Sequence, residues 1–143
     1  MSRWIVSALA GLGLFASALE AEAGGRLVAF VSIAEQTMTV SYDGSVVDRW
    51  PVSTARRGYS TPTGSYRPFR LSRMWYSKKY DNSPMPHSIF FRGGYAIHGT
   101  GSIRSLGRPA SHGCVRLHPQ DAATLYSMVR DVGLGNTEIV ITR

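Results

Sequence analysis

The 143-residue sequence contains a single cysteine, Cys114, so no disulfide can form within the chain. A small scaffold stapled by several disulfides is therefore excluded. The length suffices for one hydrophobic core but not for two. Hydrophobic residues make up 43% and charged residues 17%, a balance that also excludes a disordered chain. The composition predicts one ordinary globular domain.

The N-terminal segment MSRWIVSALAGLGLFASALEAEAGG differs in kind from the rest of the chain. Arg3 precedes an apolar run from Trp4 to Phe15, and small residues then lead to the A-x-A sequence ending at Ala23. This pattern predicts a secretory signal peptide over residues 1–23, followed by a single domain over residues 24–143. An uncleaved anchor or a buried helix is the alternative, but the run is short and weakly flanked for a membrane span. We expect no stable membrane span after cleavage, and export to the periplasm of a Gram-negative cell.

Acidic residues are scarce, with 9 Asp and Glu against 16 Lys and Arg. Removal of residues 1–23 takes away Arg3, Glu20 and Glu22, so 15 cations and 7 anions remain and the formal charge is about +8. Such a charge favours a polyanionic partner through salt-sensitive attraction. Nucleic acid is not expected for an exported protein, and acidic cell-envelope polymers fit better. The alternative is that the basic surface serves only solubility.

The segments after the predicted leader have mainly β character. Asp43-Gly44 is a hairpin signal because both turn positions favour positive φ. Residues 72–87 are mixed and contain Pro84 and Pro86, so we expect a short strand followed by an irregular loop. One helix is predicted over Pro119–Val132, with proline in its first turn and Gly133 at its end. Further strands are expected at 27–33, 37–42, 46–52, 65–71, 88–100 (interrupted by Gly93-Gly94) and 137–143. The predicted fold is a mainly β single domain, a β-sandwich or partial barrel with one principal helix near the C-terminus.

The segment SHGCVRL, residues 111–117, surrounds the lone cysteine with groups suited to catalysis. A free thiol is a liability in an oxidising compartment unless it is buried or its reactivity is used. The neighbouring histidine and arginine predict a lowered thiol pKa. His98 and His112 are candidate bases, and the small residues Ser111 and Gly113 let backbone N–H groups approach a carbonyl. This is the Cys-His arrangement of acyl-transfer enzymes, although an inert buried thiol remains the alternative.

Other roles are possible for several of these residues. His98, His112, Cys114 and His118 could in principle bind zinc, but their spacing is unusual for a zinc site, and we expect neither a metal nor another cofactor. His118 is expected to help start the helix. Trp75, Tyr76 and Tyr80 could stack on sugar rings, with ordinary aromatic packing as the default expectation.

The motifs together resemble the L,D-transpeptidase catalytic domain, also called the YkuD domain. IHGT at 97–100 is followed by SHGCVRL, with twelve residues from Gly99 to Ala110 between the histidine and the serine. This resembles the family signature of a histidine, a variable loop, then Ser/Thr-His-Gly-Cys, a hydrophobic residue and Arg or Asn. STPTGSY at 60–66 and MPHSIFFRGGYAIHGT at 85–100 resemble further family segments. The resemblance covers nearly all of residues 24–143.

The resemblance implies roles for the matching positions. Cys114 would be the nucleophile and His98 its general base, oriented by the backbone carbonyl of Gly99. The backbone amides of His112, Gly113 and Cys114 would form the oxyanion hole; the catalytic role of the His112 ring is left open. Two further residues of the motif, Arg116 and Ser111, would contact substrate or brace the loop.

The implied reaction is an acyl transfer on peptidoglycan stem peptides. The thiol would attack a tetrapeptide stem, release D-alanine and form a thioester, which an amine of a second stem would resolve into a 3→3 cross-link. An outer-membrane protein could also supply the acceptor amine. With water as acceptor, the same residues would give an L,D-carboxypeptidase or hydrolase. A non-catalytic cell-wall-binding domain is the alternative of another class.

Overall fold

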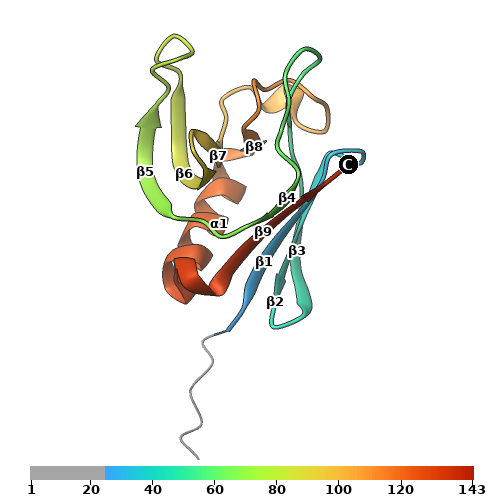
Figure 1. Ribbon diagram of the computed structural model, residues 1–143, viewed down its shortest axis with the longest axis vertical. Coiled ribbons are helices and arrows are strands. Elements are labelled where there is room, and N and C mark those ends of the chain that lie inside the picture. Colours follow the sequence, from blue (N-terminus) through green and yellow to red (C-terminus); the bar gives the residue numbers. More distant parts are fainter. Residues whose placement is uncertain (1–24) are drawn as a thin grey trace, which may run out of the picture.

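The computed structural model describes residues 25–143, and the predicted signal peptide therefore lies outside the described residues. Within these residues nine strands form two sheets, and one α-helix packs mainly against the second of them (Figure 1). The strands are β1 Leu27–Ser32, β2 Thr37–Tyr42, β3 Ser45–Pro51, β4 Gly64–Tyr66, β5 Arg70–Tyr76, β6 Pro84–Arg92, β7 Tyr95–Gly99, β8 Val115–Leu117 and β9 Thr137–Thr142. The helix α1 spans Pro119–Val132. The mainly β class with one C-terminal helix is confirmed.

The first sheet has the strand order β3-β2-β1-β9-β4. β1 and β2 are antiparallel neighbours, and β2 continues into β3 through the predicted turn at Asp43 and Gly44, whose φ angles are 48° and 82°. β9 pairs in parallel with β1 and antiparallel with β4. The last strand of the chain is therefore held between two strands from its first half.

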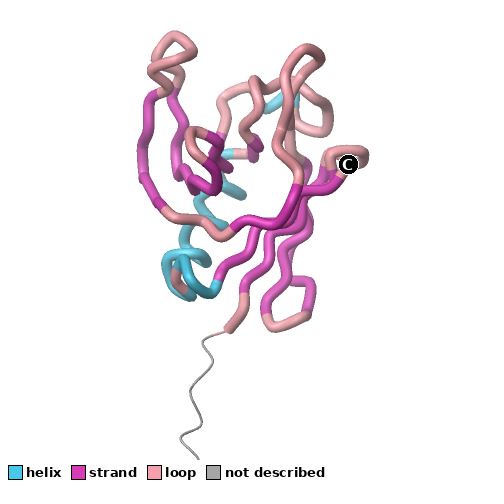
Figure 2. The backbone as a smooth tube through the Cα atoms, viewed as in Figure 1, coloured by secondary structure: helices cyan, strands magenta, loops and turns pink. Residues whose placement is uncertain are grey.

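The second sheet has the order β5-β6-β7-β8. β5, β6 and β7 form an antiparallel meander, whereas β7 and β8 are parallel. The connection from β7 to β8 is an irregular loop with a short 3₁₀ turn at Ile103–Ser105. Figure 2 shows that this loop, the β5–β6 tip and the β3–β4 loop lie at the same end of the molecule.

The core lies between the sheets and the helix. α1 packs mainly on β6 and β7, and its buried residues are Ala122, Leu125 and Val129. They join apolar side chains of both sheets in one cluster, which includes Val31, Met38, Ile97, Leu117 and Ile139. Two further residues of α1, Met128 and Val132, are only partly buried against this cluster.

Two local predictions were wrong. The strand expected at 65–71 is divided between β4 in the first sheet and β5 in the second, with Pro68 in the crossing segment. Pro84 and Pro86, expected in a loop, lie in β6. Prolines are tolerated there because β7 pairs only with Ile89–Arg92, so this half of β6 has β5 as its one sheet neighbour.

Within residues 25–143, none of the helical segments is both long and apolar enough to cross a membrane.

Candidate active site

The parallel pairing of β7 with β8 brings the two principal candidates together. His98 lies opposite Arg116 in the register, and Cys114 immediately precedes β8. His98, Cys114 and Arg116 all line one cavity of about 280 Å³. The predicted nucleophile and base therefore share a cavity, although they are separated by sixteen positions in the chain.

The His98 ring is buried, and its Nδ1 lies 2.7 Å from the carbonyl oxygen of Gly99. A carbonyl oxygen can only accept, so Nδ1 carries the ring proton and Nε2 keeps its lone pair. Burial lowers the pKa of His98 from 6.5 to about 4, the Gly99 hydrogen bond opposes this, and the Arg116 charge adds to it. The ring is therefore neutral at pH 7, with the tautomer that a general base needs.

Cys114 is a free, half-buried thiol beside the small cluster of Met85, Phe90 and Ala96. Desolvation raises its pKa above the ordinary value of 9.0, while the Ala96 N–H and the Arg116 charge pull it down by less. The lowered thiol pKa expected from sequence was wrong in net direction, because burial outweighs the neighbouring cation. The resting pair is a neutral thiol beside a neutral imidazole.

The loop Ser111–Cys114 is held by its own side chains and by a glycine. The buried Ser111 Oγ donates to the Cys114 carbonyl at 2.6 Å and accepts from the Gly113 N–H at 3.0 Å. These bonds place Ser111 as a brace of the loop, and they occupy the Gly113 amide that was expected to serve an oxyanion. Within residues 25–143, the N–H groups of His112 and Cys114 donate to no acceptor, so they are the remaining candidates for binding an oxyanion.

Gly113 is required at its position for two reasons. Its φ is 135°, where other residues are strained, and an added Cβ would lie 2.6 Å from the Tyr95 ring and 2.9 Å from the Ser60 carbonyl oxygen. The close approach of these groups lets the loop turn tightly behind the thiol.

The sequence did not indicate Thr61 as an individual site residue, although Thr61 lies in the STPTGSY segment that resembles the family. Its buried hydroxyl accepts from the Ala55 N–H at 3.0 Å and donates to the Gly113 carbonyl at 2.9 Å. It thereby connects the β3–β4 loop to the loop that bears Cys114.

Arg116 is half-buried in the same cavity as His98. One guanidinium nitrogen donates to the Ala110 carbonyl at 3.3 Å, and its backbone exchanges hydrogen bonds with Ser53. No carboxylate within residues 25–143 pairs with it. The guanidinium can therefore both brace the loop and receive a substrate carboxylate.

The His112 ring contacts side chains from two other loops. It stacks on Tyr80 with centroids 4.0 Å apart and planes 9° apart, and it meets Tyr59 edge-on at 4.8 Å. Arg56 donates to Nε2 at 2.7 Å, which requires an unprotonated Nε2. Desolvation and then the charges of Arg56, Arg116 and Lys79 lower the His112 pKa. Sequence had suggested stacking on sugar rings or, by default, ordinary aromatic packing for Tyr80, whereas the structure shows it stacked on His112.

Two cavities meet at Cys114. The first is the 280 Å³ cavity that contains His98 and Arg116. The second, of about 550 Å³, has an aromatic and cationic lining that includes Phe69, Arg70, Trp75, Lys78 and Lys79. Residues that line both are Ser77, Tyr80, Met85, His112 and Cys114. The Cys114 side chain therefore borders both spaces.

The remaining candidates have structural positions. His118 caps α1, with Nδ1 accepting from the Gln120 N–H at 3.1 Å, as expected. Trp75 packs edge-on against Phe90 and under Arg70. In the described part of the chain, no three His, Cys, Asp or Glu side chains gather in a way that could hold a metal ion.

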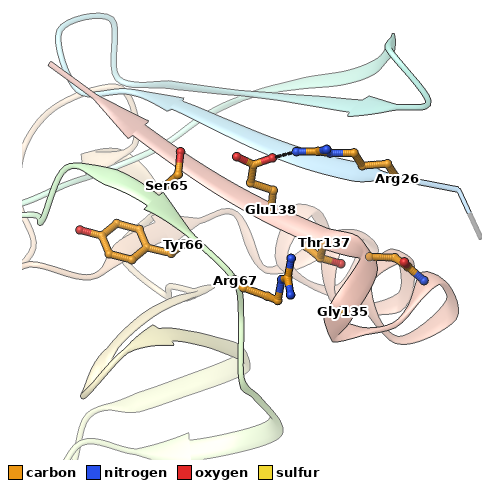
Figure 3. Close-up of a pocket in the computed structure, with 8 residues that line it drawn as sticks. Arg26, Ser65, Tyr66, Arg67, Gly135, Thr137 and Glu138 are labelled. Carbon is orange, nitrogen blue, oxygen red and sulfur yellow. Dashed lines mark hydrogen bonds and ion pairs between the residues drawn. The ribbon is translucent and has the colours of Figure 1, made fainter.

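A separate cavity of about 530 Å³ lies between β4, β9 and the turn before β9 (Figure 3). Arg26 and Glu138 form an ion pair beside it, and Arg67 and Thr137 also line it. It shares no lining residue with the two cavities at Cys114. No thiol or imidazole lines this cavity.

Comparisons with known proteins agree with this geometry. A family model described as the L,D-transpeptidase catalytic domain matches residues 26–141. L,D-transpeptidase 1 of Mycobacterium tuberculosis is 28% identical over 122 residues, which are 76% of this chain and 49% of that protein. The structure of an L,D-transpeptidase from Mycobacterium smegmatis has a TM-score of 0.76 and 25% identity, covering 84% of this chain and 60% of that one.

A third similar structure is L,D-transpeptidase 3 from Mycobacterium tuberculosis with a faropenem-derived adduct, with a TM-score of 0.72 and 25% identity. It covers 84% of this chain and 61% of that one. The chain thus spans less than two thirds of each of these three relatives' own length.

Proposed function

The chain belongs to the L,D-transpeptidase catalytic domain family, and from this membership we propose that it is a cysteine L,D-transpeptidase acting on peptidoglycan stem peptides. The observation that carries the proposal is the shared cavity of Cys114 and His98, with Nδ1 of His98 committed to Gly99 and Nε2 left as the base. This arrangement suits acyl transfer to and from a thiol.

In the first half-reaction, Sγ of Cys114 attacks the carbonyl that joins the third stem residue to D-alanine. His98 Nε2 takes the thiol proton as the C–S bond forms, because both groups are neutral at rest. The N–H groups of His112 and Cys114 stabilise the oxyanion. The C–N bond then breaks, His98 returns the proton to the leaving amine, and D-alanine departs from the thioester.

In the second half-reaction, an amine of another stem attacks the thioester carbonyl. Its nitrogen forms the new amide and gives a proton to His98, the C–S bond breaks, and the thiolate recovers that proton. Arg116, with no carboxylate partner within residues 25–143, receives a stem carboxylate in the same cavity. The product is a 3→3 cross-link. An amine of an outer-membrane protein is the other acceptor included in the proposal.

The proposal also places the enzyme in the periplasm. Its support is the leader-like pattern of residues 1–23 and the formal charge of the remaining chain, which favours an anionic envelope polymer.

The first experiment is mass spectrometry of the domain over residues 24–143 with a disaccharide tetrapeptide, beside Cys114→Ala. Release of D-alanine with a 3→3 dimer, absent in the variant, is the expected result. Release of D-alanine with tripeptide alone identifies the carboxypeptidase instead. Absence of both products, together with cell-wall binding that Cys114→Ala retains, identifies a non-catalytic domain.

Faropenem gives an independent test of the nucleophile. Because a family member carries a faropenem-derived adduct, we expect a covalent adduct on Cys114 and none on Cys114→Ala. A second variant, His98→Gln, should keep the thiol but slow adduct formation by about 10²–10⁴-fold, the usual contribution of a general base. An equal rate in wild type and His98→Gln contradicts the assigned base.

A further inference from the structure

The tip of the β5–β6 hairpin, residues 77–83, contributes to both cavities that contain Cys114. Tyr80 connects the tip to the loop Ser111–Cys114, because its ring stacks on the His112 ring with centroids 4.0 Å apart. Tyr80 and His112 each line both cavities, so their stack lies at the junction of the two spaces, beside the thiol.

The His112 ring is fixed from its other sides. Arg56 donates to Nε2 at 2.7 Å, Tyr59 meets the ring edge-on at 4.8 Å, and the Arg56 guanidinium lies 5.1 Å from the Tyr59 ring. The β3–β4 loop, the loop that bears His112 and the hairpin tip lie at the same end of the molecule (Figure 2). Side chains of the β3–β4 loop therefore hold the His112 imidazole in place, and Tyr80 stacks on this imidazole.

Hydrogen bonds within the hairpin tip hold the backbone around Tyr80. The Ser77 N–H donates to the Ser83 carbonyl at 2.9 Å, and the Tyr80 carbonyl accepts from both the N–H and the hydroxyl of Ser83. Asp81 and Asn82 turn the chain in left-handed conformations, with φ of 50° and 55°. These hydrogen bonds hold the backbone position from which the Tyr80 ring extends to His112.

Access to the thioester decides the product, because water competes with the acceptor amine. In hydrolysis a water oxygen adds to the thioester carbonyl and passes a proton to His98. The C–S bond then breaks, the thiolate recovers that proton, and the stem leaves as a tripeptide acid. Transfer uses the same base and the same carbonyl, so the two outcomes differ only in what reaches the thioester. A narrow approach at the junction disfavours water, while an amine held by its own stem still reaches the carbonyl.

We propose that Tyr80 is a positioning residue whose stack on His112 narrows the approach of water to the Cys114 thioester and thereby sets the ratio of transfer to hydrolysis. This inference rests on the proposed function and deepens it by assigning the choice of acceptor to a named contact. In this proposal the His112 ring holds Tyr80 by stacking and does not transfer protons, because its Nε2 already accepts a hydrogen bond from Arg56.

The ring of Tyr80, and not its hydroxyl, makes this contact, so a phenylalanine should preserve it. An aromatic pair favours the stacked arrangement by a factor of roughly three to ten. Tyr76, at the end of β5 in the same hairpin, is 50% exposed and lines neither cavity at Cys114. Tyr76→Ala is therefore the matched control for the loss of one hairpin tyrosine.

The experiment measures tripeptide and 3→3 dimer formed from a disaccharide tetrapeptide by wild type, Tyr80→Ala, Tyr80→Phe and Tyr76→Ala. We expect Tyr80→Ala to raise the ratio of tripeptide to dimer about threefold to tenfold. D-alanine release is measured in the same reactions, so that the ratio of the two products is compared separately from the total rate of acylation. Tyr80→Phe and Tyr76→Ala should keep the wild-type ratio.

A second variant tests the contact between Tyr80 and His112 by removing a group that holds the His112 ring. Arg56→Ala removes the donor to His112 and should raise the ratio in the same direction, by about twofold to threefold. The inference is overturned if Tyr80→Ala leaves the ratio unchanged while dimer forms normally, or if Tyr80→Phe matches Tyr80→Ala. A wild-type protein that releases no D-alanine overturns the proposed function itself, so the two failures are distinguishable.

Discussion

Lowering the pH from 7 to 4 should destabilise the fold through the buried imidazole of His98. In the folded protein burial lowers its pKa to about 4, whereas the unfolded chain titrates near 6.5. As the pH falls through 6.5, the unfolded state binds a proton that the folded state does not, so the free energy of unfolding declines. The decline ends near the folded pKa. At about 1.4 kcal/mol per pH unit across this interval, the loss is about 3 kcal/mol.

Urea denaturation at pH 7, 6, 5 and 4 measures this loss, with His98→Gln as the comparison. Glutamine does not titrate, and every other group is common to both proteins. The wild type should lose about 3 kcal/mol more than His98→Gln between pH 7 and pH 4. Parallel stability profiles would refute the argument, because they would mean that His98 gains its proton as readily in the folded state as in the unfolded chain.

Three further predictions concern the loop that holds the thiol. Gly113→Ala should lower the free energy of unfolding by at least about 1–3 kcal/mol, through its φ of 135° and the 2.6 Å approach to Tyr95. Gly107→Ala, with φ of 92° but open space around it, should cost less in the same urea titration. Thr61→Val should destabilise by about 1–3 kcal/mol and lower kcat/KM for D-alanine release, because it leaves the partly buried Ala55 N–H and the buried Gly113 carbonyl without their hydrogen-bond partner. Thr61→Ser should retain both properties, and equal losses in the two variants would argue against the hydrogen bonds. Arg116→Gln should reduce kcat/KM for the tetrapeptide by about tenfold, as expected for loss of a charged contact to a carboxylate, and an unchanged value would make Arg116 a brace only.

Elements defined by local signals were predictable from sequence. Pro119 and Gly133 bound the helix at the positions where the structure begins and ends it. Asp43-Gly44 likewise specified a hairpin turn from two residues. The prolines of β6 misled because their tolerance depends on how far β7 extends beside that strand, which is a property of the sheet and not of the segment.

The candidate site shows the same division between motif and environment. The pattern around Cys114 and His98 indicated which groups would meet, and β7–β8 pairing brings them into one cavity. The direction of the thiol pKa was not readable, because desolvation depends on residues packed from other strands. The stack of Tyr80 on His112 joins residues 32 positions apart and carries no local signal.

The position of β9 constrains how the chain can reach its fold. Because β9 pairs with β1 on one side and β4 on the other, the first sheet cannot close until residues 137–142 are available. A chain emerging from its N-terminus therefore exposes the inner edge of β1 throughout synthesis, and such long-range parallel pairing is slow to form. Removal of β9 alone would leave both β1 and β4 without this neighbouring strand. Vectorial synthesis thus delays closure of this sheet until the C-terminal strand has emerged.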